Sequence, residues 1–349
     1  MSWLTPIDAT AWFTPRPGEN RLGQTLHCLP QVSSAAAFYE SLQQAWDAGQ
    51  RIAIVGVPES LGPRANLGRG GAEHAFAAAL QGILSLQDNP MIAAHELLLV
   101  GQVDCEDLQQ QGDALRPTDP GELARLRELV ERLDQRVQTV LTPLFETGFD
   151  VILIGGGHNN AYPLIHSLHT ATGQGVGAVN LDPHADFRAR EGRHSGNGFS
   201  YAYMEGALTH YHVLGLHEGK NNAEILKQLN QAEFSYRSIH DLYLEDWRSE
   251  LLALTNQVET WQVPVGIEVD VDALHGVPAS AINFNGLSIA HAYRFVELLA
   301  QLPYTRYLHL AEAAPSLHPA GREAGDMACA QLLSELVLAY LHGFQRREP

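Results

Sequence analysis

Short apolar runs alternate with amphipathic helices along most of the chain, and this alternation restricts the fold more than any other feature. Several runs are apolar on both faces, among them "RIAIVGV" (51–57), "DVILIGGG" (150–157), "GVGAVNLD" (175–182) and "VPVGIEVDVD" (263–272). Strands buried on both sides are typical of parallel sheets that helices cover on either face. The sequence therefore predicts an α/β fold of three layers, α/β/α, with a mostly parallel central sheet.

The same patterns predict further strands at 211–216 and 305–312. They predict helices at 121–148, 160–172, 221–230, 288–302 and 325–344. The first 35 residues carry Pro and Gly without periodicity, so we expect an irregular N-terminal arm, taken here as 1–45. No break in composition follows it, and residues 46–349 are expected to form a single domain.

Composition and charge exclude several classes of protein. The chain of 349 residues is 45% hydrophobic, which is typical of a globular protein, and its net charge of −18 disfavours nucleic acid or an anionic membrane as a partner. The three cysteines, Cys28, Cys105 and Cys329, form no CxxC pair, which fits a reducing compartment. No secretory signal is visible, and no stretch approaches the roughly 20 apolar residues of a membrane span. We expect a cytoplasmic protein.

Polar side chains follow four of the predicted strands, where ligands bind in open α/β sheets. Side chains at positions i, i+2 and i+4 of an extended segment share a face, so the members of one such group can converge on one point. The residues are His158 after "GGG", Asp182, His184 and Asp186 in "DPHAD", Glu268, Asp270 and Asp272 in "EVDVD", and Glu312 in "HLAEAAP".

These groups together favour a metal site. Carboxylates gathered in a semi-buried place repel one another unless cations lie between them. Asp and His ligands without Cys suit Mn²⁺, with Ni²⁺, Zn²⁺ or Fe²⁺ possible. The set exceeds what one ion needs while leaving room for a substrate, so two ions that share bridging carboxylates fit better.

Simpler explanations exist for each feature taken alone. A single Asp or His after a strand is usually a helix cap or a loop hydrogen-bonding group. The triple glycine could form a phosphate loop, but no Lys-Ser/Thr pair follows it. The joint pattern favours the metal site. For five other histidines we expect surface or supporting positions: His169, His210, His212, His217 and His318.

Taken together, "GGGH", "DPHAD" and "EVDVD" resemble the three metal motifs of the ureohydrolase superfamily, which comprises arginase, agmatinase and formimidoylglutamase. Two more stretches agree, "GVPESLGPRANLGRGGAEHAF" (56–76) and "LHLAEAAP". The resemblance runs from about residue 50 to the C-terminus and implies the arginase-like fold, so that 46–349 would be the catalytic domain. It implies a metal-dependent hydrolase of linear amidines or guanidines. It also allows a homo-oligomer.

Carried over residue by residue, the resemblance implies a binuclear Mn²⁺ site. One ion would be bound by His158, Asp182, Asp186 and Asp270, and the other by His184, Asp182, Asp270 and Asp272, so that Asp182 and Asp270 bridge. Asp186 would orient the attacking hydroxide and help to protonate the leaving nitrogen. Glu312 would pair with the cationic N–H groups of the substrate, and Asn197 would also contact the substrate.

Two positions bear on which reaction the enzyme performs. Phe199 aligns with a His that handles protons in arginase and agmatinase, and Arg188 stands two residues beyond Asp186; both features resemble formimidoylglutamases. The fork of Arg188 suits a carboxylate of N-formimino-L-glutamate, although a salt bridge that neutralises the acidic cluster is the alternative. The resemblance thus implies formimidoylglutamase, with arginase, agmatinase, a guanidino-acid or guanidine hydrolase, or a non-catalytic metal-binding relative as alternatives.

Overall fold

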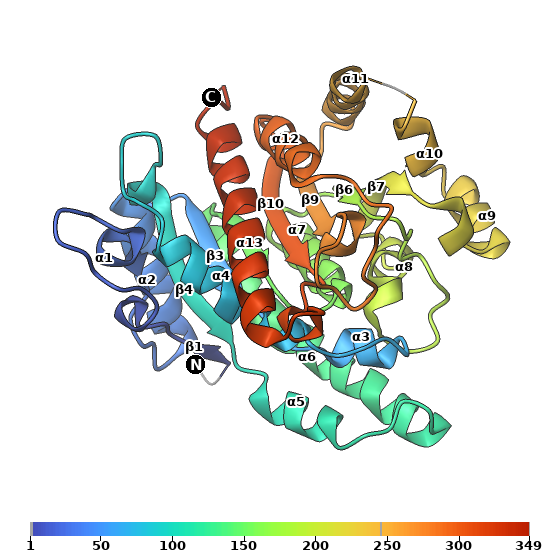
Figure 1. Ribbon diagram of the computed structural model, residues 1–349, viewed down its shortest axis with the longest axis horizontal. Helices are drawn as coiled ribbons and strands as arrows, with labels where there is room; N and C mark the ends of the chain where they lie inside the picture. Colours follow the sequence, from blue (N-terminus) through green and yellow to red (C-terminus); the bar gives the residue numbers. More distant parts are fainter. Residues whose placement is uncertain (1–2, 245, 349) are drawn as a thin grey trace.

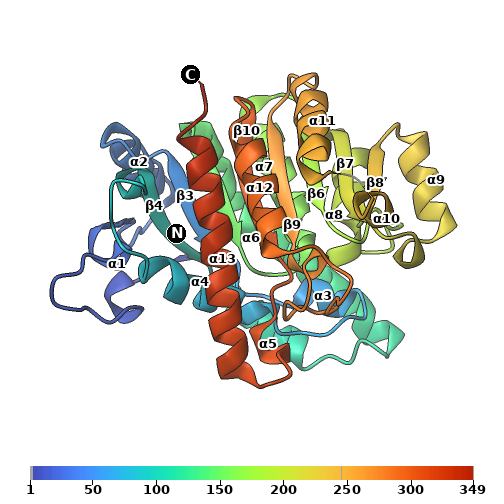
Figure 2. The same ribbon diagram turned by 45° about the horizontal axis from the view of Figure 1, so that its top comes forward.

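A central sheet with helices on both faces forms the core of the protein in this computed structural model, which describes residues 3–244 and 246–348. Figures 1 and 2 show its strands side by side, with helices in front of them and behind them. The strands are β1 (Leu4–Thr5), β2 (His27–Cys28), β3 (Ile52–Gly56), β4 (Leu97–Val103), β5 (Asp150–Ile154), β6 (Val176–Leu181), β7 (Leu208–Leu216), β8 (Ser235–Ser238), β9 (Val265–Asp270) and β10 (Thr305–Ala311).

The strand order is β1-β4-β3-β5-β10-β9-β6-β7-β8, and β2 also pairs with β4. The pairings are parallel except for the short β1, which runs antiparallel to β4. The predicted three-layer α/β/α fold with a mostly parallel sheet is therefore confirmed.

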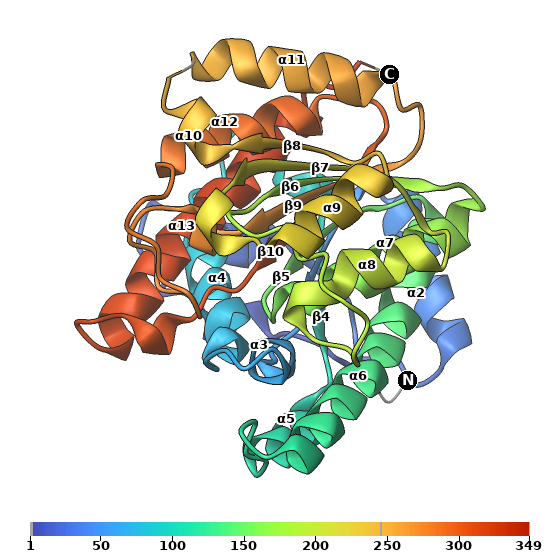
Figure 3. The same ribbon diagram turned by 90° about the vertical axis from the view of Figure 1, so that its right-hand side faces the viewer.

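The described helices surround this sheet. α13 packs between α4 and α12 over one face, and α6 and α7 pack together over the other (Figure 3). Their bounds are α1 (Leu22–Thr25), α2 (Ala35–Asp47), α3 (Leu61–Ala65), α4 (Ala75–Leu84), α5 (Glu106–Asp113), α6 (Pro120–Thr147), α7 (Ala161–Thr172), α8 (Gly198–Met204), α9 (Ala223–Gln231), α10 (Ile239–Leu242), α11 (Trp247–Glu259), α12 (Ile289–Ala300) and α13 (Arg322–Phe344).

Local signals explain where the longest helix begins and ends. Asp119 caps α6 by accepting hydrogen bonds from the backbone N–H groups of Gly121 and Glu122, and Pro120 occupies the first turn, where its missing N–H costs nothing. Gly148 ends the helix with a left-handed φ of 108°. The sequence predicts this helix over 121–148, within one residue of the observed Pro120–Thr147 at each end.

The expectation of an irregular N-terminal arm over 1–45 is wrong. β1 and β2 both pair with the side of β4 that faces away from β3, and α2 (Ala35–Asp47) is capped by Ser34, whose side chain accepts the N–H of Ala37. Two-residue strands are too short to show a period of two, so only their pairing with β4 reveals them. Residues 3–45 thus contribute two strands to the central sheet and most of α2.

By length and composition, α13 could cross a membrane, but 61% of its most apolar segment is buried inside the protein. The helix lies against α4 and α12, as a core helix of a globular domain does.

Close packing of α4 on α13 leads to a prediction about stability. A Cβ atom at Gly82 would overlap the carbonyl oxygen of Ala330 in α13. Helix propensity alone would make Gly82→Ala stabilising by about 1 kcal/mol, whereas the overlap predicts a loss of about 1–3 kcal/mol in the free energy of unfolding. Denaturant unfolding decides the sign, and the exposed neighbour Gln81→Ala is the control. A stabilised Gly82→Ala variant would contradict the packing.

Candidate metal centre

The polar residues singled out in the sequence meet at the carboxyl ends of four adjacent parallel strands, β5, β10, β9 and β6. His158 follows the glycine turn after β5, and Asp182 follows β6 directly. Asp270 is the last residue of β9, and Glu312 comes just after β10. The sheet topology therefore brings together four chain segments that are far apart in sequence.

Two overlapping groups of side chains could each hold a metal ion. The first consists of His158, Asp182, Asp186 and Asp270, and the second of Asp182, His184 and Asp272. The ligand atoms within each group lie within 4.8 Å of one another. All six predicted metal ligands are thus brought together.

One ring nitrogen is the focus of the first group. His158 Nδ1 lies 3.2 Å from Asp182 Oδ2, 3.0 Å from Asp186 Oδ2 and 3.5 Å from Asp270 Oδ2. A single ring proton cannot satisfy three carboxylates. A cation coordinated by all four groups would, so the donor set fits a divalent metal.

Asp182 links the two groups through its two oxygens. Its Oδ1 lies 3.4 Å from His184 Nδ1, which is also 3.4 Å from Asp272 Oδ2. Asn180 steadies the other oxygen by donating from Nδ2 to Oδ2 at 3.1 Å. Asp270 belongs to the first group only, so its bridging role stays a prediction.

Two of the site residues have unusual backbone angles. Asp186 has a φ of 43° and Glu312 a φ of 66°, in the left-handed region that side-chain-bearing residues rarely adopt. Such conformations gather where the surroundings enforce a particular side-chain direction, as at functional sites.

The glycine turn before His158 is held by a carboxylate that the sequence analysis did not single out. Glu59, fully buried after β3, accepts hydrogen bonds from Gly157 N at 2.7 Å, Asn160 Nδ2 at 2.8 Å and Gly62 N at 3.1 Å. The Asn159–Asn160 pair therefore serves this turn: Asn160 binds Glu59, and the Asn159 carbonyl accepts a hydrogen bond from Arg193.

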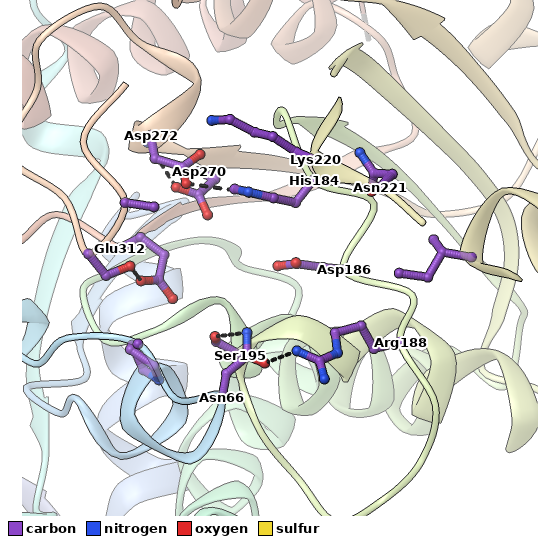
Figure 4. A pocket seen from close by; sticks show the side chains of 15 residues that line it. Asn66, His184, Asp186, Arg188, Ser195, Lys220, Asn221, Asp270, Asp272 and Glu312 are labelled. Carbon is purple, nitrogen blue, oxygen red and sulfur yellow. Dashed lines mark hydrogen bonds and ion pairs between the residues drawn. The ribbon is translucent and has the colours of Figure 1, made fainter. Parts of the chain in front are cut away.

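A cavity of about 290 Å³ opens above the two groups (Figure 4). Its lining includes His184, Asp186, Asp270, Asp272 and Glu312. The polar residues on the rest of its wall are Asn66, Arg188, Ser195, Lys220, Asn221 and Ser280. A small polar molecule entering this cavity would reach both candidate metal positions.

The pKa values of the site residues reflect the negative charge that is crowded there when no metal is bound. Burial and the nearby Asp182 raise the pKa of Asp186 to about 6, and burial and Asp270 raise the pKa of Glu312 to about 8. Burial opposes charge on His184 as well, but Asp272 and Asp182 raise its pKa to about 10. Protons thus occupy positions at which cations would replace them.

Glu312 faces the cavity with both oxygens held. Oε1 accepts the backbone N–H of His158 at 3.0 Å, and Oε2 accepts the hydroxyl of Ser280 at 2.6 Å. The carboxylate is therefore fixed in one orientation toward a substrate.

Arg188 also reaches the cavity, and its partners lie outside the acidic cluster. Nη1 donates to Asn66 Oδ1 at 2.6 Å and Nη2 to Glu191 Oε1 at 3.1 Å, while 43% of the side chain is exposed. The alternative of a salt bridge that neutralises the cluster is not seen here.

Asn197 is buried away from the cavity, contrary to its expected contact with the substrate. Its Oδ1 accepts hydrogen bonds from Arg193 Nη1 and His194 N, and its Nδ2 donates to the carbonyls of Ala189 and Gly192. The side chain shapes the loop that carries Arg188. Its amide has no capacity left for a ligand.

Phe199 lies behind the metal groups and outside the cavity lining. Its buried ring stacks on Tyr211 with centroids 4.4 Å apart and meets His158 edge-on at 5.3 Å. The alignment of Phe199 with the proton-handling His of arginase and agmatinase stays a prediction, but its ring does not line the cavity. Its ring supports His158 instead.

Sequence reasoning missed two of the most informative residues, Lys220 and His309. Lys220 lies in the turn after β7, so the rule that ligands bind beyond strand ends could have found it. His309 lies inside β10 and is fully buried, and only the tertiary structure brings it near His158. The five histidines expected elsewhere belong to neither candidate metal group.

Comparisons with known proteins agree with this architecture. Among curated relatives, the formimidoylglutamase of Macrococcus caseolyticus is 28% identical over 50% of this chain, and the match spans only 56% of that enzyme. The formimidoylglutamase of Psychrobacter cryohalolentis is 24% identical over 89% of this chain and 91% of its own length.

Solved structures share the fold. Formimidoylglutamase from Bacillus subtilis superposes with a TM-score of 0.74 at 16% identity, covering 96% of this chain and 95% of that one. Formiminoglutamase from Trypanosoma cruzi, solved with Mn²⁺, gives 0.69 at 19% identity, covering 95% and 100%. The sequence profile of the arginase family matches residues 50–339. The chain belongs to the arginase family.

Proposed function

We propose that this protein is a formimidoylglutamase, which hydrolyses N-formimino-L-glutamate to L-glutamate and formamide at a binuclear manganese site. The observation that carries the proposal is the cavity in which two metal groups sharing Asp182 lie beneath two cationic side chains, Arg188 and Lys220. The named relatives and the manganese in the Trypanosoma cruzi structure support it.

The six metal ligands would hold two Mn²⁺ ions, which when bound would supply Lewis-acid activation of the attacking water. His158, Asp182, Asp186 and Asp270 would hold one ion, and Asp182, His184 and Asp272 the other. The candidate ligand atoms are carboxylate oxygens and ring nitrogens, which suit Mn²⁺.

Two carboxylates would handle the reacting atoms. Asp186 takes a proton from the attacking water and passes it to the nitrogen of glutamate as the C–N bond breaks. Glu312, held by Ser280 and the backbone of His158, pairs with the N–H groups of the cationic amidine. The left-handed backbone at both residues aims these carboxylates into the cavity.

The two carboxylates of the substrate lie at different distances from its reacting carbon. The two cationic side chains of the cavity, Lys220 and Arg188, likewise occupy different places. Lys220 runs beside His184 with its ammonium group toward Asp272, whereas Arg188 lies on the opposite wall beside Asn66 (Figure 4). No carboxylate of the described residues lies within 4.0 Å of the Lys220 ammonium. Lys220 would bind the α-carboxylate near the metal, and Arg188 the distal one.

Cell context follows from the proposed substrate. The reaction belongs to histidine breakdown and would take place in the cytoplasm, which the three free cysteines support. The proposed ligand is a small molecule, and a homo-oligomer stays a prediction of the family resemblance.

A substrate panel tests the proposed reaction. Enzyme loaded with Mn²⁺, and in parallel with Ni²⁺, is assayed with formiminoglutamate, arginine, agmatine, guanidinobutyrate and guanidine. We expect kcat/KM to be highest for formiminoglutamate by about ten- to a hundredfold, because each carboxylate–cation contact that a competitor lacks is worth about 1.5–3 kcal/mol.

Formamide and glutamate should be the products. Urea as the main product, from a faster guanidine-bearing substrate, would assign the protein to the guanidino-hydrolases instead.

The variant Asp182→Ala removes the shared ligand and should lose both metal and activity. Full activity in Asp182→Ala would overturn the binuclear site.

Substitution of the two pocket cations tests substrate binding. We expect Arg188→Ala and Lys220→Met each to raise KM for formiminoglutamate about ten- to a hundredfold, because each loses one charged hydrogen bond, with little change in kcat. Steady-state kinetics measure this. Arg190→Ala and Lys227→Met, both exposed, are the matched controls. An unchanged KM in Arg188→Ala would restrict Arg188 to holding Asn66 and Glu191.

Metal binding should release protons. Without metal the pKa of His184 is about 10 and that of Asp186 about 6, so at neutral pH His184 must lose a proton before it can coordinate an ion. The apparent affinity for Mn²⁺ should therefore rise as the pH increases from about 6 to about 8. Calorimetric titrations in buffers of different ionisation enthalpy count the protons. Equal affinity across this range, with no proton release, would contradict the expectation.

A further inference from the structure

A buried polar level lies one step below the metal ligands in the sheet. The strand register places Asn180 of β6, Glu268 of β9 and His309 of β10 side by side. Glu268 precedes Asp270 by two residues and therefore shares its face of the strand. All three side chains of this level are fully buried. The metal ligands thus rest on polar groups instead of apolar ones.

Glu268 is surrounded by three side chains that can donate to it. Its Oε2 lies 2.6 Å from His309 Nδ1 and 3.4 Å from His158 Nε2. Its Oε1 accepts the hydroxyl of Tyr307 at 2.7 Å. These three side chains surround a carboxylate that is closed to solvent.

The two ring nitrogens of His158 face opposite environments. Nδ1 points to the three aspartates of the first metal group, and Nε2 points to Glu268. Phe199 and His309 pack edge-on against the ring, at centroid distances of 5.3 Å and 5.6 Å. The ring is thus confined, with its two nitrogens facing carboxylates on opposite sides.

We propose that Glu268 is a positioning residue for metal binding: it holds the proton of His158 on Nε2 and so keeps the Nδ1 lone pair directed at the first ion. A carboxylate that accepts the second N–H of a ligand His fixes its tautomer and orientation and raises its basicity. Tyr307 and His309 hold Glu268, as Asn180 holds Asp182 on the other side. The inference rests on the metal site of the proposed function.

A third metal ion is the competing explanation, because ligand atoms of His158, Glu268 and His309 also lie within 4.8 Å of one another. Two observations favour the hydrogen-bonded arrangement. The 2.6 Å separation of Glu268 and His309 is that of a direct hydrogen bond, and a third ion would compete with the first for His158.

Glu268→Gln is the decisive variant, because it keeps the shape of the side chain and removes its charge. Mn²⁺ binding to the metal-free protein is measured by equilibrium dialysis, with electron paramagnetic resonance reporting the spin-coupled ion pair. We expect two ions in the wild type. In Glu268→Gln one ion should bind about ten- to a hundredfold more weakly. The resonance spectrum of this variant should then show single Mn²⁺ ions, whereas that of the wild type shows the spin-coupled pair.

Two further variants separate positioning from general stability. Tyr307→Phe removes a hydrogen bond from the other oxygen of Glu268, and should leave both affinities within a few-fold of the wild type. His309→Gln frees Oε2 and should weaken the same ion as Glu268→Gln, which provides a second test if Glu268→Gln does not fold.

The outcomes distinguish this inference from the proposed function. A wild type that binds no Mn²⁺ overturns both. Two tight ions in the wild type and unchanged affinities in both Glu268→Gln and His309→Gln overturn the positioning role alone. A third tight ion in the wild type, lost in His309→Gln, replaces the positioning role with a third metal site.

Discussion

The crowding of carboxylates at the ends of β6 and β9 is the constraint on which the rest of the structure depends. Asp182, Asp186 and Asp270 all approach one nitrogen of His158 in a place from which most water is excluded. Such charges remain together only if cations or protons lie between them. A parallel sheet makes the arrangement possible, because its neighbouring strands end at one edge.

The side chains at the carboxyl ends of the strands form three successive levels, which differ in the groups that they carry. At the lowest, Asn180, Glu268 and His309 orient ligands by hydrogen bonds and are closed to solvent. The middle level holds the metal ligands, and the upper one is a cavity with cations on opposite walls. This order separates the buried, hydrogen-bonded groups from the cavity-lining groups that would select a substrate.

Most of the central sheet could be predicted from the sequence, because β3, β5, β6, β9 and β10 are apolar on both faces. Strand β4 could not be predicted, because Gly101 and Gln102 interrupt its apolar run in the way that a turn does. Gly101 has a φ of 126°, and a bulge at this point shifts the register of β4 with β3. The short strands of the N-terminal segment exist only through their pairing with β4.

The sequence by itself determined the chemistry of the site: the ligand types, their two-residue spacing and their place after apolar strands, all of which are local properties. Only the tertiary structure decided which groups the other side chains near the site contact. The path of the chain from Arg188 to Phe199 depends on a buried ion pair of Arg193 with Asp134 in α6, 59 residues away in sequence. Within this segment Arg188 lines the cavity, whereas Asn197 and Phe199 do not. Periodicity states which residues share a face, but not what that face will pack against.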